Sequence, residues 1–136
     1  MDDLNGKTVA TESNSTAITA IKKFAPQAKV VLFADDNSCL QAVQQGRAEA
    51  YVLDQGILLG DASKATDVKV VGTPFTQEPY GIGTPKQNPE MKKFVDDWLK
   101  KIQDAGLWQR LYALTIGKVV TGAAPTPPAI GSVPGS

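Results

Sequence analysis

The stretch Cys39 to Gly56, CLQAVQQGRAEAYVLDQG, carries the features that decide the fold. Its pattern predicts a short helix, a turn at Gly46, and a buried strand over residues 48–53 that ends directly before Asp54. The strand is mostly apolar, which is typical of a parallel strand covered on both faces. In open α/β sheets, ligands bind just outside the carboxyl ends of the strands. We therefore expect Asp54 either to bind a cationic group, such as an α-ammonium, or to cap the helix that follows.

Outward from this stretch, predicted strands and helices alternate through the first half of the chain. Runs rich in β-branched residues predict further strands at residues 7–11, 29–33 and 68–71. Amphipathic runs between them predict helices at residues 16–24, 38–45 and 56–62. This alternation predicts an α/β fold with a doubly wound, mostly parallel sheet and right-handed crossovers.

The chain changes character after residue 72. Two prolines within residues 73–79 predict a linker, and residues 80–84 predict a short strand. Asn88, Pro89 and Glu90 signal the start of a helix that ends before Gly106, and a second helix is predicted at residues 107–114. The longer helix has an apolar stripe made of Met91, Phe94, Val95, Trp98, Leu99 and Ile102. A stripe of this kind needs a surface to bury against.

Composition excludes several classes of function. The chain has 14 basic and 14 acidic residues, so its zero net charge gives no support to nucleic-acid binding. It contains no histidine, which excludes Ser-His-Asp and Cys-His catalysis within the chain, and we expect no metal site. Cys39 is the single cysteine, and we expect it to be a small buried or half-buried residue. The alternative is a leftover cysteine whose former partner, near Ala10, is missing and which could link two chains in an oxidising compartment. The polar, acidic start MDDLNGK predicts no signal peptide in this chain.

Five segments, in order, resemble the extracytoplasmic solute-binding proteins of family 3, the polar amino-acid receptors of ABC importers. DLNGKTV at residues 3–9 is similar to the DLxGKxV opening of that family's second lobe. AVQQGRAEAYVLD at residues 42–54 is similar to its ALxxGRxDAxVxD segment. The other matching segments are NSTA at residues 14–17, PYGIG at residues 79–83 and FVDDWLKKIQDAGLWQRL at residues 94–111.

The resemblance implies one lobe of a two-lobe fold, the type II periplasmic-binding-protein fold, in which the lobes close on the ligand. Residues 1–78 would form the second lobe, and residues 79–117 would be a return strand and terminal helices that belong to the first lobe. Residues 118–136 are rich in Ala, Pro and Gly and predict a flexible tail. The N-terminal bulk of the first lobe would be missing, which explains why the apolar stripe lacks a partner.

The resemblance also implies a ligand site at the strand ends. Asp54 matches the acid that binds the ligand's α-ammonium, because a charge-assisted hydrogen bond is strong in a closed cleft. Asn14, Ser15 and Thr16 match a turn at a helix N-terminus that favours a carboxylate, although Ser15 and Thr16 also suit plain capping. Asn14 stands where the family has glycine, and asparagine tolerates a left-handed backbone. Glu12 and Leu53 fall where relatives read the ligand's side chain.

The function implied is that of part of an amino-acid-binding protein, for a polar ligand such as glutamate or glutamine, without catalysis or a cofactor. Its partners would be the ligand, the missing lobe and an ABC permease, and its location would be extracytoplasmic. We expect weak or no binding by this chain alone. An extracellular sensing module of a signalling receptor is the alternative. The apolar stripe would be covered by the chain's own second lobe or by a second copy, in a homodimer that exchanges segments across residues 73–79.

Overall fold

A computed structural model describes residues 1–78, 80–120 and 125–131. The chain divides into two compact units, Met1–Thr76 and Gln77–Ser136. Among the described helices, none combines the length and the apolar character that a membrane crossing requires.

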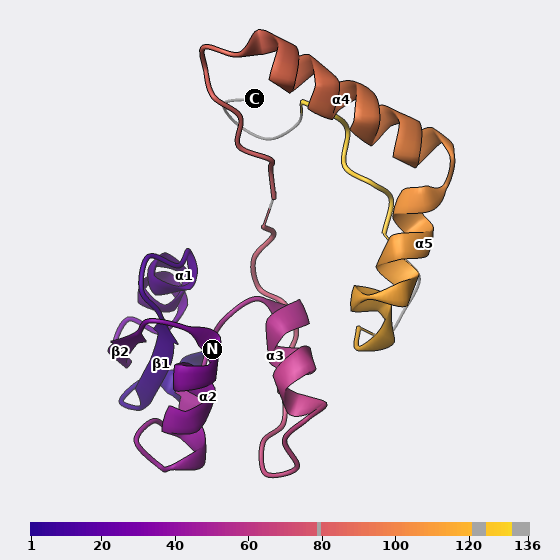
Figure 1. The fold of residues 1–136 in the computed structure, drawn as a ribbon. Helices are drawn as coiled ribbons and strands as arrows, with labels where there is room; N and C mark the ends of the chain where they lie inside the picture. The colour runs from indigo at the N-terminus through magenta and orange to yellow at the C-terminus, as the bar shows by residue number, and fades with distance from the viewer. Residues whose placement is uncertain (79, 121–124, 132–136) are drawn as a thin grey trace. The chain divides into compact units, whose positions relative to one another are not determined.

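The first unit is built on a parallel sheet. Its described strands are β1 (Thr8–Glu12), β2 (Lys29–Phe33) and β3 (Ala50–Tyr51), arranged in the order β2-β1-β3. Figure 1 labels β1 and β2. A short 3-10 helix, η1 (Asp2–Leu4), precedes β1. The register pairs Val9 with Val30 on one side and with Ala50 on the other. The central strand β1 therefore holds both neighbours, and Val9 and Ala10 within it are fully buried.

Helices α1 (Ala17–Phe24) and α2 (Asp36–Gln44) cover opposite faces of this sheet. Successive side chains of a strand point to opposite faces. Val9 packs with Ala17 and Ile21 of α1, whereas Ala10 packs with Cys39 and Ala42 of α2. The sequence-based prediction of a doubly wound α/β fold is thus confirmed.

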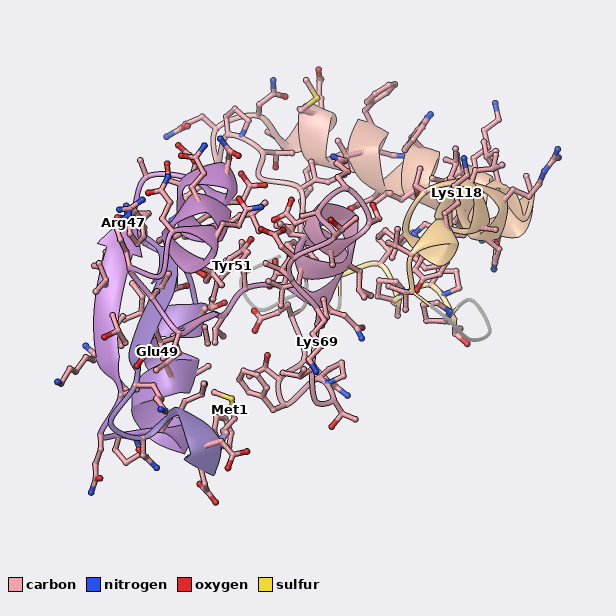
Figure 2. All side chains as sticks on the ribbon, turned by 90° about the horizontal axis from the view of Figure 1, so that it is seen from below. Met1, Arg47, Glu49, Tyr51, Lys69 and Lys118 are labelled. Carbon is pink, nitrogen blue, oxygen red and sulfur yellow. The ribbon has the colours of Figure 1, made fainter. Side chains whose placement is uncertain are left out.

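Local signals in the sequence set the ends of these helices. Asp35 begins α2, because its Oδ1 accepts a hydrogen bond of 2.7 Å from the Ser38 N–H. Gly46 follows α2 with a φ of 69°, a left-handed conformation that glycine adopts without strain. The third helix, α3 (Gln55–Ala62), follows β3 and is tied to it by Tyr51 (Figure 2). The Tyr51 hydroxyl donates to Asp61 Oδ2 over 3.1 Å, and burial of the Tyr51 side chain raises its pKa.

A buried threonine links β1 to β3 at their carboxyl ends. Thr11 is fully buried, and its Oγ1 donates to the Val52 carbonyl over 2.8 Å. The Val52 N–H in turn donates to the Ala10 carbonyl over 3.0 Å. These two bonds extend the contact between the strands beyond the two residues of β3, which is shorter than the strand predicted at residues 48–53.

Two predicted strands are wrong. Residues 68–71 and 80–84 form no strand in the structure, although their β-branched content favours one. Strand propensity mainly reflects how well side chains fit a pleated, half-buried surface, and it needs a neighbouring strand to be realised. Lys69 and Val71 are exposed in the first segment, and Tyr80 and Ile82 are exposed in the second. Without a partner strand, these residues remain irregular.

The second unit contains two α-helices, α4 (Pro89–Asp104) and α5 (Leu107–Leu114), among its described residues, followed by the 3-10 helix η2 (Ile116–Lys118). Asn88 begins α4 as predicted, since its Oδ1 accepts from the Met91 N–H over 2.9 Å. Gly106, with a φ of 67°, separates the two helices. Within α5, the rings of Trp108 and Tyr112 stack with centroids 5.6 Å apart.

The apolar stripe of α4 is only partly covered. Ile102 is buried, and Val95 and Leu99 are half-buried. Met91, Phe94 and Trp98 keep 45%, 66% and 48% of their surface exposed, so half of the stripe faces solvent. The solvent-exposed face of α4 carries three ion pairs at i,i+4 spacing, Lys92–Asp96, Lys93–Asp97 and Lys100–Asp104. Each pair adds little to the stability of the helix, because its side chains are exposed to water.

The predicted tail, residues 118–136, falls partly outside the described residues. Residues 118–120 and 125–131 are described, and Lys118 still belongs to η2, so the tail begins after this residue. The side-chain amide of Gln103 in α4 donates to the Pro128 carbonyl over 3.2 Å. The predicted flexibility of this tail stays a prediction.

Cys39 makes the stability of the first unit depend on pH above neutrality. Burial raises the pKa of its thiol from 9.0 to about 11, with the Glu12 and Asp35 carboxylates adding to the shift. The unfolded chain therefore releases this proton near pH 9, whereas the folded protein keeps it. We expect unfolding free energy to fall by on the order of 2 kcal/mol between pH 9 and 11 because of this group. Urea unfolding of the wild type and of Cys39→Ala isolates the effect; parallel pH curves would contradict it.

Thr11 can be tested by removing its hydroxyl. Thr11→Val leaves the buried Val52 carbonyl without this donor, so we expect a loss of about 1–3 kcal/mol in unfolding free energy. Thr19→Val, at an exposed position on α1, is the matched control and should stay within about 0.5 kcal/mol of the wild type. Equal losses in the two variants, measured by urea unfolding, would show that the Thr11 bond contributes nothing.

Candidate functional site

The candidate site lies at the carboxyl ends of β1 and β3, where the order of the strands reverses. The chain passes from β1 outward to β2 and then returns across the sheet to β3. α1, which follows β1, covers one face of the sheet, whereas Tyr51 of β3 packs on the α2 face and donates to Asp61 of α3, so the segments that follow β1 and β3 diverge at this point. Ligands of open α/β sheets bind at such a switch point. The predicted site residues follow these two strands, namely Glu12, Asn14, Ser15, Thr16, Leu53 and Asp54.

The turn after β1 has a left-handed residue at its centre. Asn14 has a φ of 64°, as expected for an asparagine that replaces glycine, and it is the one non-glycine residue with positive φ in the described ranges. The turn is held by two backbone bonds. The Ser13 N–H donates to the Phe33 carbonyl over 2.8 Å, and the Ser15 N–H donates to the Glu12 carbonyl over 3.4 Å.

Ser15 has a structural role in this turn. Its Oγ accepts a hydrogen bond of 3.1 Å from the Ala17 N–H, and its carbonyl accepts from the Ile18 N–H over 3.3 Å. Thr16 occupies the N-cap position of α1 but makes no capping bond through its side chain. The capping interpretation is therefore confirmed for Ser15 and wrong for the Thr16 side chain. Both residues lie at the positive end of the α1 dipole.

Asp54 stands at the start of α3. Its carbonyl accepts from the N–H groups of Ile57 and Leu58 at 3.0 and 3.1 Å, so its backbone begins the helix. Its carboxylate makes no capping hydrogen bond. The interpretation of the Asp54 side chain as a cap is thus wrong, and the residue is half-buried at the end of the sheet.

Glu12 and Leu53 lie on neighbouring strand ends. The register pairs Ala10 with Tyr51, and two further residues along each chain lead to Glu12 and Leu53. Both side chains are half-buried. The topology thus brings Glu12, Leu53 and Asp54 to one edge of the sheet, next to the turn at Asn14–Thr16.

Sequence reasoning missed Thr11, which positions this edge by bonding Val52. A hydroxyl directly after the apolar pair Val9-Ala10, within a predicted strand, is the signal that could have found it. A buried hydroxyl needs a hydrogen-bond partner, and the nearest acceptors are on adjacent strands.

A surface depression of the first unit lies away from this edge. This shallow depression of about 720 Å³ runs between α2 and the segment after α3, lined by Asp36, Leu40, Gln44, Asp61, Lys64 and Asp67. None of the predicted ligand residues lines it. Across the described ranges, no cluster of three or more Asp, Glu or Cys side chains could hold a metal ion. The switch point remains the better candidate, because it gathers backbone donors and carboxylates at strand ends.

Replacing Ser15 tests its role in the turn. Ser15→Ala removes the acceptor for the Ala17 N–H, and we expect a loss of about 1 kcal/mol in unfolding free energy. Ser13→Ala, two residues earlier and exposed, is the control and should change stability little. An unchanged urea midpoint for Ser15→Ala would mean that solvent or another group satisfies the Ala17 N–H equally well.

Comparison with known proteins identifies relatives along most of the chain. It is 32% identical over 107 residues to the ABC transporter glutamine-binding protein GlnH of Bacillus subtilis, covering 79% of this chain and 39% of that protein. It is 31% identical over 125 residues to the glutamate-binding protein GluB of Corynebacterium glutamicum, covering 87% of this chain and 42% of that protein. The chain thus spans about two fifths of the length of these relatives. No protein-family model matches it.

Solved structures agree with the sequence comparison. An ancestral arginine-binding protein bound to glutamine superimposes with a TM-score of 0.78 at 31% identity, covering 85% of this chain and 52% of that one. A mutant of the arginine-binding protein ArgBP from T. maritima gives a TM-score of 0.77 at 27% identity, covering 85% of this chain and 50% of that one. The parallel β2-β1-β3 sheet and the motifs at residues 3–9 and 42–54 agree with this likeness. The chain therefore belongs to the family 3 extracytoplasmic solute-binding proteins and spans a part of their length.

Proposed function

We propose that this chain is part of an amino-acid-binding protein of an ABC importer and takes a polar amino acid such as glutamine or glutamate. The observation that carries the proposal is the switch point at the carboxyl ends of β1 and β3, where the topology brings Glu12, Leu53 and Asp54 together next to the Asn14–Thr16 turn. Relatives named for binding glutamine and glutamate support this ligand class. The absence of histidine and the binding-protein names of these relatives support a role without catalysis.

The chemistry of the edge suits a zwitterion. Asp54 would accept charge-assisted hydrogen bonds from the ligand's α-ammonium. The Asn14–Thr16 turn, at the positive end of α1, would favour a carboxylate of the ligand. Glu12 would favour an amide or cationic side chain over an anionic one, and Leu53 would contribute an apolar contact.

A second half of the site is required for tight binding. The chain spans about two fifths of its curated relatives, and a ligand at one sheet edge stays open to water. Water weakens each charged hydrogen bond, because the local dielectric stays high. We propose that residues 1–78 act as one lobe, that residues 79–117 belong to the other, and that a complementary N-terminal lobe closes over the ligand. The exposed side chains of Met91, Phe94 and Trp98 on α4 support such a missing partner surface.

Location and other partners follow from the same proposal. A receptor of this family delivers its ligand to a permease, so the chain would act outside the cytoplasmic membrane with an ABC permease as partner. A homodimer that exchanges segments across residues 73–79 would be another way to cover the α4 stripe, and it stays a prediction.

Calorimetry with a panel of polar amino acids tests the function. The proteins compared are this chain and a chimera that carries the complementary N-terminal segment of the glutamine-binding relative. We expect weak or no heat from the chain alone and binding by the chimera. Asp54→Asn should weaken chimera binding by at least about tenfold, or 1.4 kcal/mol, because it removes the charge that holds the ammonium.

Asp35→Asn is the matched control for that experiment. Asp35 follows β2, away from the switch point, and asparagine caps a helix as well as aspartate does. We expect this variant to bind like the unmodified chimera. The proposed function would be contradicted if the folded chimera bound no amino acid of the panel. It would also be contradicted if Asp54→Asn and Asp35→Asn changed binding by the chimera equally.

A further inference from the structure

The outer edge of β2 is an unpaired strand edge with apolar side chains. β2 reads KVVLF, with neither proline nor glycine, and its single charge stands at its first residue. Val31 and Leu32 keep 40% and 50% of their surface exposed. β2 stands last in the order β2-β1-β3, so β1 occupies one of its edges and the other edge is open among the described residues. Such edges are templates for pairing with another chain.

Hydrogen bonds to β1 define which backbone groups the open edge presents. The Lys29 N–H donates to the Lys7 carbonyl and the Phe33 carbonyl accepts from the Ser13 N–H, both over 2.8 Å. Alternate residues of a strand point their backbone groups to the same side. Lys29, Val31 and Phe33 therefore face β1, and Val30 and Leu32 direct their N–H and C=O groups to the open edge.

We propose that this edge is a docking surface for a second copy of the chain, which pairs β2 with β2 antiparallel about a two-fold axis through Leu32. Leu32 of one protomer then exchanges two backbone hydrogen bonds with Leu32 of its partner. Two-fold symmetry requires a self-complementary patch, and antiparallel pairing of identical strands satisfies it. The paired sheets would form one continuous sheet through both protomers.

The register follows from charge complementarity. With Leu32 on the axis, Val31 lies opposite Phe33, and Lys29 lies toward Asp35 at both ends of the paired segment. Lys29 and Asp35 are both exposed, and the Asp35 backbone is extended with φ of −152° and ψ of 166°. A register centred on Val31 would instead place Lys29 opposite Phe33 and lose both charge pairs. Opposite charges across strands stabilise pairing, and apolar pairs add to this.

The contact is short, so we expect weak and concentration-dependent association. Seven residues per protomer, 29–35, form an interface at the small end of the known range, where complexes are transient. This dimer does not use the α4 stripe or the ligand edge. Its presence or absence is therefore independent of the proposed function.

Sedimentation velocity of the full chain from micromolar to millimolar concentration tests the proposal. We expect a reversible monomer–dimer equilibrium. Leu32→Lys would bring like charges together on the axis and raise the dimer dissociation constant by at least about tenfold. Val71→Lys is the matched control at another exposed valine of the first unit, 74% exposed, and should leave the constant unchanged. Circular dichroism verifies that both variants are folded. Lys29→Glu, which would face Asp35, should also weaken the dimer.

Cysteine cross-linking tests the register. Residues in a hydrogen-bonded antiparallel pair have Cα atoms about 5.5 Å apart, within reach of a disulfide. Under mild oxidation, Leu32→Cys should give covalent dimers readily and Val31→Cys should give few; the native Cys39 is fully buried. Preferential cross-linking of Val31→Cys would overturn the register. A chain that stays monomeric at millimolar concentration, or a dimer unaffected by Leu32→Lys, would overturn the proposal.

Discussion

The pairing of β1 with both of its neighbours is the constraint on which the first unit depends. β1 is the one described strand with partners on both sides, and Val9, Ala10 and Thr11 within it are fully buried. Val9 forms the core under α1, while Ala10 forms the core under α2 with Cys39 and Ala42. A shift of one residue in this strand would exchange the two faces and place Thr11 in an apolar core without its acceptor.

This constraint also creates the candidate site. Because β2 and β3 flank β1, the chain leaves the sheet in different directions after β1 and after β3. The Thr11 hydroxyl holds the two strand ends together through Val52, beyond the end of the short β3 ladder. The turn at Asn14 and the start of α3 at Asp54 are therefore supported by the same buried contact.

Two exposed apolar surfaces, one on α4 and one on β2, indicate where partners could bind. Phe94 and Trp98 on α4 and Leu32 on β2 are large apolar side chains that the described parts of the chain leave exposed. Contiguous exposed apolar surface marks interaction sites in soluble proteins, so each of the two surfaces, taken by itself, points to a partner. The two surfaces differ in kind, since a helix stripe packs against side chains whereas a strand edge also offers backbone hydrogen bonds.

The sequence by itself determined the strands at residues 29–33 and near 8–12, every helix that local caps delimit, and the left-handed turn at Asn14, because these depend on contacts between near neighbours. Order along the chain also sufficed for the parallel, doubly wound sheet, since βαβ crossovers have one hand. Only the tertiary structure decided that residues 68–71 and 80–84 form no strand, because a strand exists through its partner. It also decided that Asp54 does not cap α3 with its carboxylate and that Thr11 joins β1 to β3. Hydrogen-bond partners distant in sequence are set by three-dimensional packing, and a local pattern does not encode them.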